Sequence, residues 1–497
     1  MFLCFYCGSL TCGMLVSPKG RTSWPTALAI VNDGREIIDV RFISRCVLVC
    51  REIVTRLHQL RLCLEFFHCL RKIHRMRSKL LLVLLGLTQM ASISFGEWPQ
   101  FRGPNGNGIS DAKNLPITWG AGKNVKWKTA IPGRAWSSPV IFKNQIWMTT
   151  ATENGSQLSV VCVDQGTGKI LHNEKIFEVE APQFAHRFNT YGSPTPVIES
   201  GRLYASWGSP GIACIDTETA KVIWARRDFI CNHYRGAGSS VCLFDNLLIH
   251  HFDGSDHQFV VALDKRTGKT VWRTERSVDY KDASPDGKPE REGDWRKAFS
   301  TPRVFKIDGK PILISQGSKA FYAYDPFTGK EVGRVEDTKT HSVGTTPIFG
   351  HGLIFLCSGN GRGEVLALRP DGKGVVNESN IVWRVSRNVP TRPSLLLVED
   401  LLFMISDGGI STCLEATTGK EIWRERIGGN FSASPLYAEG HIYFFNEEGK
   451  ATVINAARQF KILAENELGD GFMASAAVEG NALFLRSRTE LFRIENE

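Results

Sequence analysis

The stretch VVALDKRTGKTVW, residues 260–272, decides the fold because the chain repeats it. It predicts a short strand, a tight polar turn and the start of a second strand. Close copies are VVCVDQGTGKILH at 160–172, GIACIDTETAKVIW at 211–224, FYAYDPFTGKEVG at 321–333 and STCLEATTGKEIW at 411–423. Weaker copies are RPDGK at 369–373 and NAARQFK at 455–461. A period of roughly 40–60 residues built from strands is typical of a β-propeller blade.

Each residue type in the quoted stretch has a structural reason. Ala262 is small where the strand is most crowded, and the carboxylate of Asp264 caps the turn. Gly268 supplies a positive φ, after which a second strand begins. Trp272 is large enough to lie between neighbouring blades, and Trp residues recur in this place at 224, 383 and 423. A repeat copies its structural residues, so we interpret these tryptophans as spacers between blades.

A further pair of predicted strands precedes every copy. In SSPVIFKNQIWMTT, from residue 137, small residues and a proline open one strand, and a turn with asparagine leads to an aromatic-rich second strand. SPTPVIESGRLYASW, from residue 193, has the same form. Each unit therefore contains four strands.

The two ends of the chain complete each other. Seven copies contain the turn, and an eighth unit starts at residue 471 but ends without a fourth strand. NVKWKTAI at 124–131 supplies the missing strand, with Trp127 in the place of the outer-strand tryptophan. The sequence predicts an all-β fold: an eight-bladed β-propeller of four-stranded antiparallel blades over 119–497, closed by an N-terminal strand and preceded by a short segment at 97–118.

The positive charge of the chain belongs to its leader. Residues 1–96 hold 13 Lys and Arg against 5 Asp and Glu, so 47 basic residues face 46 acidic ones from residue 97 onward. The propeller therefore has no electrostatic basis for binding nucleic acid.

A secretory signal is predicted at 76–96. MRSK is followed by the apolar run LLLVLLGL and then by small residues before Glu97, which would become the first residue of the mature protein. The alternative is a membrane anchor, but the apolar run is short for one, and no transmembrane span is expected after cleavage. Residues 1–75 indicate a start codon assigned too early, or else a disordered N-terminal extension.

The spacing of the cysteine and histidine residues does not match a metal-binding motif. Six cysteines follow residue 97 with no CxxC spacing, and three of them take the small core position of the repeat: Cys162, Cys214 and Cys413. His250 and His251 are adjacent on a strand and should point to opposite faces, so they cannot share one ion. No metal site is predicted.

The pattern AxDxxTGKxxW, complete in Ala262, Asp264, Thr267, Gly268, Lys269 and Trp272, resembles the propeller repeat of the pyrroloquinoline-quinone (PQQ) type. The resemblance covers about residues 120–497. One class of this family, the quinoprotein dehydrogenases, implies PQQ, calcium, an Asp base and often a disulfide between adjacent cysteines, and this chain has no adjacent cysteines. The other class resembles the propeller lipoprotein of the outer-membrane barrel-assembly machinery, which implies partner binding through loops without a cofactor. That class carries a Cys directly after its signal, where this chain has Glu97.

In a propeller, the loops from each outer strand to the next inner strand gather on one face. Here these loops carry the candidate site for a protein partner or a small anionic ligand: His186, Arg187, His233, Tyr234, Arg235, Trp295, Arg296, Lys297, His341, Arg387 and Arg392.

We therefore expect a monomeric, exported binding or scaffold propeller of the periplasm or extracellular space, with no cofactor and no catalytic residue. Its partner would be a protein or a small anionic ligand of the cell envelope. One alternative is a PQQ-dependent quinoprotein dehydrogenase with PQQ and calcium, which is the activity expected if the protein is an enzyme. A second alternative is a sensor propeller related to bacterial serine/threonine kinase signalling.

Overall fold

The computed structural model describes residues 3–7, 10–14 and 97–497 except 338, 372 and 377. In the N-terminal unit, β1 (Leu3–Cys7) pairs with β2 (Leu10–Met14) in antiparallel register. The predicted signal at 76–96 and most of the extension at 1–75 lie outside the described residues. No helix in the described part of the chain is both long and apolar enough to span a bilayer.

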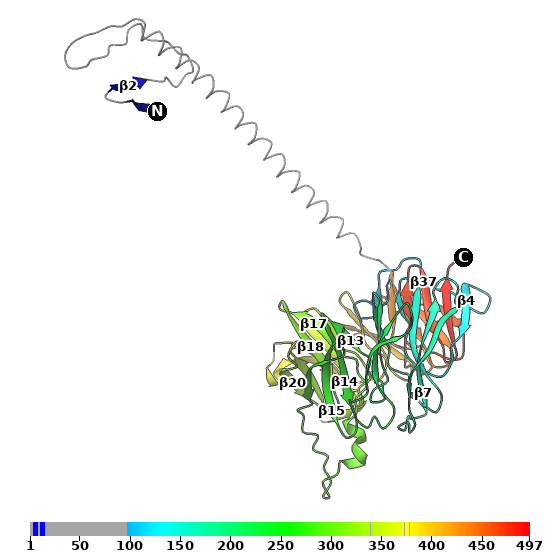
Figure 1. The fold of residues 1–497 in the computed structure, drawn as a ribbon. Helices are drawn as coiled ribbons and strands as arrows, with labels where there is room; N and C mark the ends of the chain where they lie inside the picture. The colour runs from blue at the N-terminus through cyan, green and yellow to red at the C-terminus, as the bar shows by residue number, and fades with distance from the viewer. Residues whose placement is uncertain (1–2, 8–9, 15–96, 338, 372, 377) are drawn as a thin grey trace, which may run out of the picture. The chain divides into compact units, whose positions relative to one another are not determined.

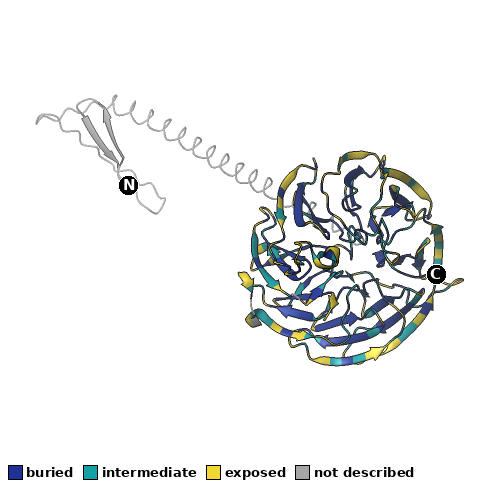
Figure 2. Cartoon of the chain, turned by 90° about the horizontal axis from the view of Figure 1, so that it is seen from below, coloured by how far each residue is buried: buried dark blue, intermediate teal, exposed yellow. Residues whose placement is uncertain are grey.

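Eight four-stranded antiparallel sheets are arranged around a centre in residues 97–497, as Figure 2 shows. Blade 1 holds β5 (Val140–Phe142), β6 (Gln145–Ala151), β7 (Gln157–Asp164) and β8 (Ile170–Glu178); blade 2 holds β9 (Val197–Glu199), β10 (Arg202–Ser206), β11 (Ile212–Asp216) and β12 (Val222–Arg226). Blade 3 holds β13 (Cys242–Phe244), β14 (Leu247–Asp253), β15 (Gln258–Asp264) and β16 (Thr270–Glu275); blade 4 holds β17 (Arg303–Ile307), β18 (Lys310–Gln316), β19 (Ala320–Tyr324) and β20 (Glu331–Glu336).

The second half of the ring repeats this order. Blade 5 holds β22 (Ile348–Gly350), β23 (Leu353–Cys357), β25 (Val365–Leu368) and β27 (Ile381–Val385); blade 6 holds β28 (Leu396–Val398), β29 (Leu401–Ile405), β30 (Ile410–Glu415) and β31 (Glu421–Arg426). Blade 7 holds β32 (Leu436–Ala438), β33 (His441–Phe445), β34 (Lys450–Asn455) and β35 (Ile462–Glu467); blade 8 holds β36 (Ala477–Glu479), β37 (Ala482–Arg486), β38 (Glu490–Glu495) and β4 (Val125–Ala130).

The antiparallel pairing of β4 with β38 confirms the predicted closure of the eight-bladed ring by an N-terminal strand, and Figure 1 shows β4 beside the C-terminal blade. Short elements decorate the blades: β3 (Ile109–Ser110), β21 (Thr340–His341), β24 (Asn360–Gly361), β26 (Gly374–Val376) and the 3-10 turns η1 (Glu290–Arg296) and η2 (Glu378–Asn380). Strand β26 adds a parallel fifth strand to the outer edge of blade 4.

In several blades, the repeated tryptophan joins one blade to the next. The Trp272 indole donates a hydrogen bond to the Pro326 carbonyl of blade 4 at 2.9 Å and covers Gly329, where a Cβ would stand 2.5 Å from the ring. Equivalent pairs are Trp127 with Gly168, Trp224 with Gly268 and Trp383 with Gly419. The predicted place of the tryptophans between neighbouring blades is confirmed.

The acidic residue of the repeat caps the turn as predicted. Asp264 Oδ1 accepts hydrogen bonds from the Thr267 backbone at 2.9 Å and from its hydroxyl at 2.8 Å. These bonds, the hydroxyl bond above all, hold the pKa of the Asp264 carboxyl below its usual value. The same contacts join Asp164 to Thr167 and Asp216 to Thr219.

A ring of hydroxyl groups links the inner strands. The Ser138 amide of blade 1 donates to Thr195 Oγ1 of blade 2 at 2.9 Å, and the ring closes where the Ser475 amide of blade 8 donates to Ser138 Oγ at 3.0 Å. The same bond, at 2.9–3.1 Å, joins Thr195 to Ser240, Ser240 to Thr301, Thr346 to Ser394, Ser394 to Ser434 and Ser434 to Ser475. At seven of the eight blade junctions, the small residue that opens the inner strand therefore satisfies a buried amide of the preceding blade. At the junction of blades 4 and 5, Thr346 Oγ1 accepts Arg102 Nη1 instead.

Residues 98–110 run along the inner strands and extend them. Trp98 exchanges backbone bonds with Ile141 of blade 1 at 3.0 and 2.8 Å, and the Ile198 amide of blade 2 donates to the Pro99 carbonyl at 2.8 Å. Further along, β3 pairs in parallel with β32 of blade 7. The fully buried Arg102 donates to Thr346 Oγ1 at 3.2 Å and to the Leu395 carbonyl at 2.6 Å, reaching blades 5 and 6. This segment thus packs as part of the propeller.

The core lies between the blades, and its buried histidines have hydrogen-bond partners in neighbouring blades. His250 Nε2 lies 2.9 Å from Ser206 Oγ of blade 2, whereas His251 Nε2 lies 2.7 Å from Ser315 Oγ of blade 4. The two adjacent histidines therefore point to opposite faces, as predicted. All six cysteines in 97–497 are buried and free.

Candidate binding rim

We use the name rim for the loops that join the outer strand of each blade to the inner strand of the next. Contacts link these loops from blade to blade. Arg134 Nη2 donates to the Arg187 carbonyl at 3.0 Å, and the His186 amide donates to the Arg235 carbonyl at 3.3 Å. The Phe299 amide donates to the Val343 carbonyl at 2.7 Å. The predicted site residues are therefore carried by consecutive loops in mutual contact.

Asp294 forms ion pairs with two of the predicted cationic residues, Arg235 and Lys297. Arg235 binds both of its oxygens, with Nε···Oδ1 at 3.0 Å and Nη2···Oδ2 at 2.7 Å, and Lys297 Nζ forms an ion pair with Oδ1. Burial favours a higher pKa for Asp294, but Lys297 and Arg235 together lower it below the usual value. Lys297 is completely buried under the Tyr234 ring, 4.8 Å from its centroid. This lysine serves as a structural cation.

Arg296 and Trp295 are held by separate partners. Arg296 forms a bidentate pair with Asp282, with Nη2···Oδ1 at 2.6 Å and Nε···Oδ2 at 3.0 Å. Trp295 stacks on His341 at a centroid distance of 5.7 Å and an interplanar angle of 26°. The ends of the insertion 277–298 are thus pinned to the rim, while residues around Gly287 stay exposed.

Arg392 bridges two blades. It binds Asp407 Oδ2 through Nε at 3.0 Å and Glu447 Oε1 through Nη1 at 3.0 Å. Its guanidinium lies 4.4 Å from the centroid of the Phe188 ring. Four predicted cations therefore have carboxylate partners within the protein: Arg235, Arg296, Lys297 and Arg392.

His233 does not face a ligand. It is 8 % exposed, its Nε2 accepts the Ser209 amide at 2.9 Å, and Cys231 Sγ lies 3.6 Å from it. Burial lowers the pKa of His233 to about 4 and raises the pKa of Cys231 to about 12. The group resembles a nucleophile–base pair in composition, but its thiol stays protonated and is shielded from solvent.

Two predicted residues are exposed, Arg187 and Arg387, and His186 is half-buried. Burial lowers the pKa of His186, and Arg235, Arg187 and Lys297 lower it further. His186 is therefore neutral at pH 7, and the accessible positive charge of the predicted set comes from the two arginines.

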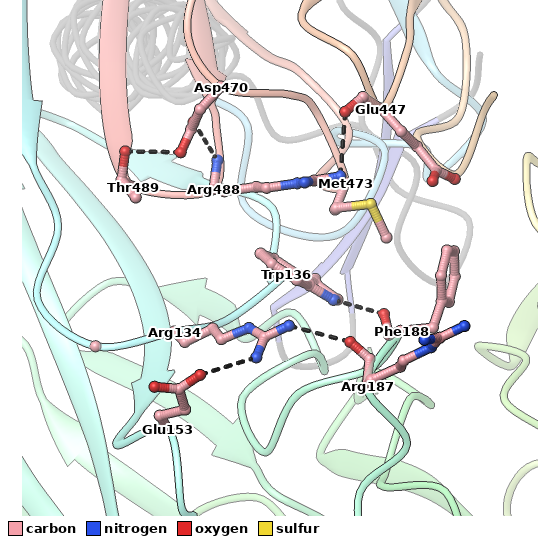
Figure 3. A pocket seen from close by; sticks show the side chains of 11 residues that line it. Arg134, Trp136, Glu153, Arg187, Phe188, Glu447, Asp470, Met473, Arg488 and Thr489 are labelled. Carbon is pink, nitrogen blue, oxygen red and sulfur yellow. Dashed lines mark hydrogen bonds and ion pairs between the residues drawn. The ribbon is translucent and has the colours of Figure 1, made fainter. Parts of the chain in front are cut away.

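A pocket of about 580 Å³ opens on the rim face at blades 7, 8 and 1, and Figure 3 shows it. The predicted Arg187 lines it together with residues that the sequence analysis did not identify: Gly133, Arg134, Trp136, Glu153, Phe188, Glu447, Asp470, Met473, Arg488 and Thr489. Glu153, Glu447 and Arg488 come from loops between the second and third strands. In an antiparallel blade these loops lie on the same face as the rim, which is the topological signal that could have identified them.

Two large apolar side chains are exposed on neighbouring rim loops. Phe184 is 61 % exposed and Ile230 is 58 % exposed. Gln183 ties the loops together, because its Nε2 donates to the Cys231 carbonyl at 3.0 Å and its Oε1 accepts the His233 amide at 3.0 Å. Phe184 also contacts Tyr234 edge-on at 6.4 Å. We call Phe184, Ile230 and Tyr234 the apolar patch.

The residues present do not fit the calcium of a quinoprotein. Within the described part of the chain, no group of three or more His, Cys, Asp or Glu side chains is placed to hold a metal ion. Two acids of the pocket, Glu447 and Asp470, already bind protein donors.

The chain matches known proteins through its propeller. A family model described as outer membrane protein assembly factor BamB matches residues 256–375 and 362–461. The chain is 24% identical to the tetrathionate hydrolase of Acidithiobacillus ferrooxidans over 191 residues, 38% of this chain and 30% of that protein. It is 22% identical to the outer membrane protein assembly factor BamB of Shewanella oneidensis over 174 residues, 35% of this chain and 36% of that protein. The matched part spans about a third of each curated relative.

A solved structure agrees on the fold. The quinohemoprotein alcohol dehydrogenase of Comamonas testosteroni superposes with a TM-score of 0.59 at 11% identity, covering 83% of this chain and 82% of that one. Because the identity is so low, this likeness concerns the architecture alone. Repeat, blade count and superposition agree on the fold: the chain is an eight-bladed β-propeller, and its residues 256–461 match the family model described as outer membrane protein assembly factor BamB.

Proposed function

We propose that the protein is an exported, non-enzymatic binding propeller whose rim holds a protein partner of the cell envelope. The observation that carries this proposal is the apolar patch. Phe184 and Ile230 expose more than half of their surface on loops that are otherwise fixed by hydrogen bonds. Exposed apolar side chains that cluster on a solvent-exposed surface are characteristic of interaction sites.

The surroundings of the patch suit a protein interface. Tyr234 belongs to the patch, and Arg187 and Arg387 are exposed on the same rim. Aromatic residues and arginine are enriched in the centres of protein interfaces, and a fixed surface loses little conformational entropy on binding.

The buried chemistry of the rim supports binding instead of catalysis. His233 and Cys231 are shielded and hold pKa values far from those of an active base and nucleophile. Lys297 and Asp294 form an ion pair with each other. The side chains that catalysis would require are thus used to fix the loops.

Export is supported by the predicted signal at 76–96 and by the outer-membrane description of the matching family. The described part of the chain contributes no membrane-spanning helix that would conflict with a soluble domain outside the cytoplasm.

Site-specific photocrosslinking tests the proposal. The full chain, with a photoreactive phenylalanine analogue at position 230, is produced in its native cells and irradiated. We expect one dominant crosslinked protein, lost in Phe184→Ser and kept in Phe327→Ser, which removes a 48 % exposed phenylalanine from a turn outside the rim. Equal crosslinking in both variants, or crosslinks to many abundant proteins alike, would reject the patch as an interface.

A further inference from the structure

We propose that the pocket at blades 7, 8 and 1 binds a carboxylate attached to an apolar or aromatic group, with the guanidinium groups of Arg187 and Arg488 receiving the carboxylate and Trp136, Phe188 and Met473 holding the apolar part. This inference rests on the proposed function only in placing the ligand on the same face. The pocket is distinct from the apolar patch.

Two of the acids that line the pocket already accept hydrogen bonds from the protein. Asp470 accepts the Arg488 amide at 3.0 Å through Oδ1 and the Thr489 hydroxyl at 2.9 Å through Oδ2. Glu447 Oε1 accepts Arg392 Nη1 at 3.0 Å and Ser432 Oγ at 2.7 Å. The charge of Glu447 is offset by Arg392, whereas Asp470 stays charged and has each of its oxygens bound by a neutral donor.

The third acid, Glu153, lies at the exposed mouth of the pocket. Its Oε1 accepts Arg134 Nη1 at 3.3 Å, and its side chain is 83 % exposed. Solvent screens this charge, so it contributes little to the field inside.

Two guanidinium groups at the pocket lack a carboxylate partner. Arg488 Nη2 donates to the backbone carbonyl of Glu447 at 3.1 Å, and within the described part of the chain its side chain has no ion pair. The Arg187 side chain has neither a hydrogen bond nor an ion pair with any residue that the structure describes. These two guanidinium groups therefore keep N–H donors that an anionic group can accept from.

The apolar wall of the pocket is fixed before any ligand arrives. Trp136 Nε1 donates to the Phe188 carbonyl at 2.9 Å, and the Arg134 guanidinium lies 5.4 Å from the Trp136 ring centroid. Figure 3 shows Trp136 between Arg488 and the Arg134–Arg187 pair, with the Met473 side chain facing the same space. The pocket combines three large apolar side chains with six charged ones, and about 580 Å³ is within the usual size of a small-molecule site.

The carboxylate can come from a free small acid or from the C-terminus of a polypeptide, and the probes separate these sources. N-acetylphenylalanine and its uncharged amide are titrated into the full chain by calorimetry, followed by the tripeptide Ala-Ala-Phe with a free or an amidated C-terminus. Saturable binding of an acid, at least about tenfold tighter than its amide, is expected from two charge-assisted contacts. Binding of the tripeptide acid as well identifies a polypeptide end, and binding of N-acetylphenylalanine alone identifies a small acid.

Matched arginine variants locate the site. Arg187→Gln and Arg488→Gln should each weaken acid binding about tenfold, whereas Arg387→Gln, an exposed rim arginine outside the pocket, should leave it unchanged. Equal binding of acid and amide, no binding of either acid at millimolar concentration, or equal loss in all three variants would overturn the proposal. Phe184→Ser should not alter acid binding, so the loss of the protein partner and the loss of this ligand can be told apart.

Discussion

The indole ring of Trp272 in blade 3 lies directly against Gly329 in the turn of blade 4. A Cβ on Gly329 would stand 2.5 Å from Trp272 Cε3, and Gly329 has a φ of 70°. The repeat therefore contains both partners of a contact between neighbouring blades. The tryptophan of one copy packs against the glycine of the next, where a side chain would collide with the indole. This is why the motif recurs from blade to blade and why it predicts a propeller.

Gly329→Ala should destabilise the propeller more than Gly309→Ala does. Both glycines have positive φ, 70° and 78°, so both alanines bear similar backbone strain, but a Cβ on Gly309 meets nothing within 4 Å. The extra cost at Gly329 should be about 1–3 kcal/mol, because the Trp272 ring must move. Thermal or urea unfolding of the two variants measures the difference, and equal stabilities would show that the indole does not pack there.

The hydroxyl ring predicts an asymmetry between two substitutions of Thr195. Valine preserves the shape but removes the acceptor for the buried Ser138 amide, at a cost of about 1–3 kcal/mol in the free energy of unfolding. Serine keeps the acceptor and should cost less. Urea unfolding compares them. A valine variant as stable as the serine variant would contradict a stabilising ring of hydroxyl groups.

Asp294→Asn should loosen the rim. The change leaves Lys297 buried without its counter-charge. Loss of one member of a buried ion pair lowers the free energy of unfolding by about 3–5 kcal/mol. Because Lys297 and Arg235 keep the pKa of Asp294 below its usual value, the contribution is present above about pH 4 and is lost as the pH falls through the lowered pKa. Limited proteolysis at 277–298 is the measurement. Glu292→Gln, an exposed charge in the same turn, is the control and should stay resistant; equal cleavage of both variants would show that Asp294 does not anchor the insertion.

Sequence patterns predicted the ring because its determinants repeat. An acidic residue, Gly and Trp recur in several blades, and the incomplete eighth unit indicated that Trp127 completes it. The segment 98–110 and Arg102 occur once, so no pattern shows that they run along the inner strands.

The rim was predicted less completely. Its loops follow from topology, but the acids that neutralise Arg296 and Arg392, Asp282 and Asp407, are found only once the chain is folded. For the same reason, the sequence placed His233 in the site although it is buried. The predicted ligand role of the rim residues remains a prediction.

Glu479 gives the propeller a pH dependence of its own. Burial and the charge of Glu97 together raise the pKa of Glu479 to about 7. Between about pH 4.5 and 7, the folded state keeps a proton that the unfolded state releases, so stability falls as the pH rises through this window. In Glu479→Gln, the decrease in the free energy of unfolding between pH 4.5 and 7 should be smaller by roughly 1–2 kcal/mol. The effect is no larger because the carboxyl is only partly buried and solvent screens it. Thermal unfolding from pH 4.5 to 7.5 measures it; Glu467→Gln should retain the wild-type slope, and an unchanged slope in Glu479→Gln would contradict the assignment.

The rim and its pocket exist only if the ring is closed, because blades 8 and 1 contribute to the pocket from opposite ends of the chain. Native-state amide hydrogen exchange on 125–130 measures this closure without any substitution. We expect the paired amides of β4 to exchange as slowly as those of the outer strands β12 and β16, because β4 is hydrogen-bonded to β38 in the same way. Exchange of 125–130 at the rate of an unpaired chain, while β36 to β38 stay protected, would contradict the closed ring and every site built on it.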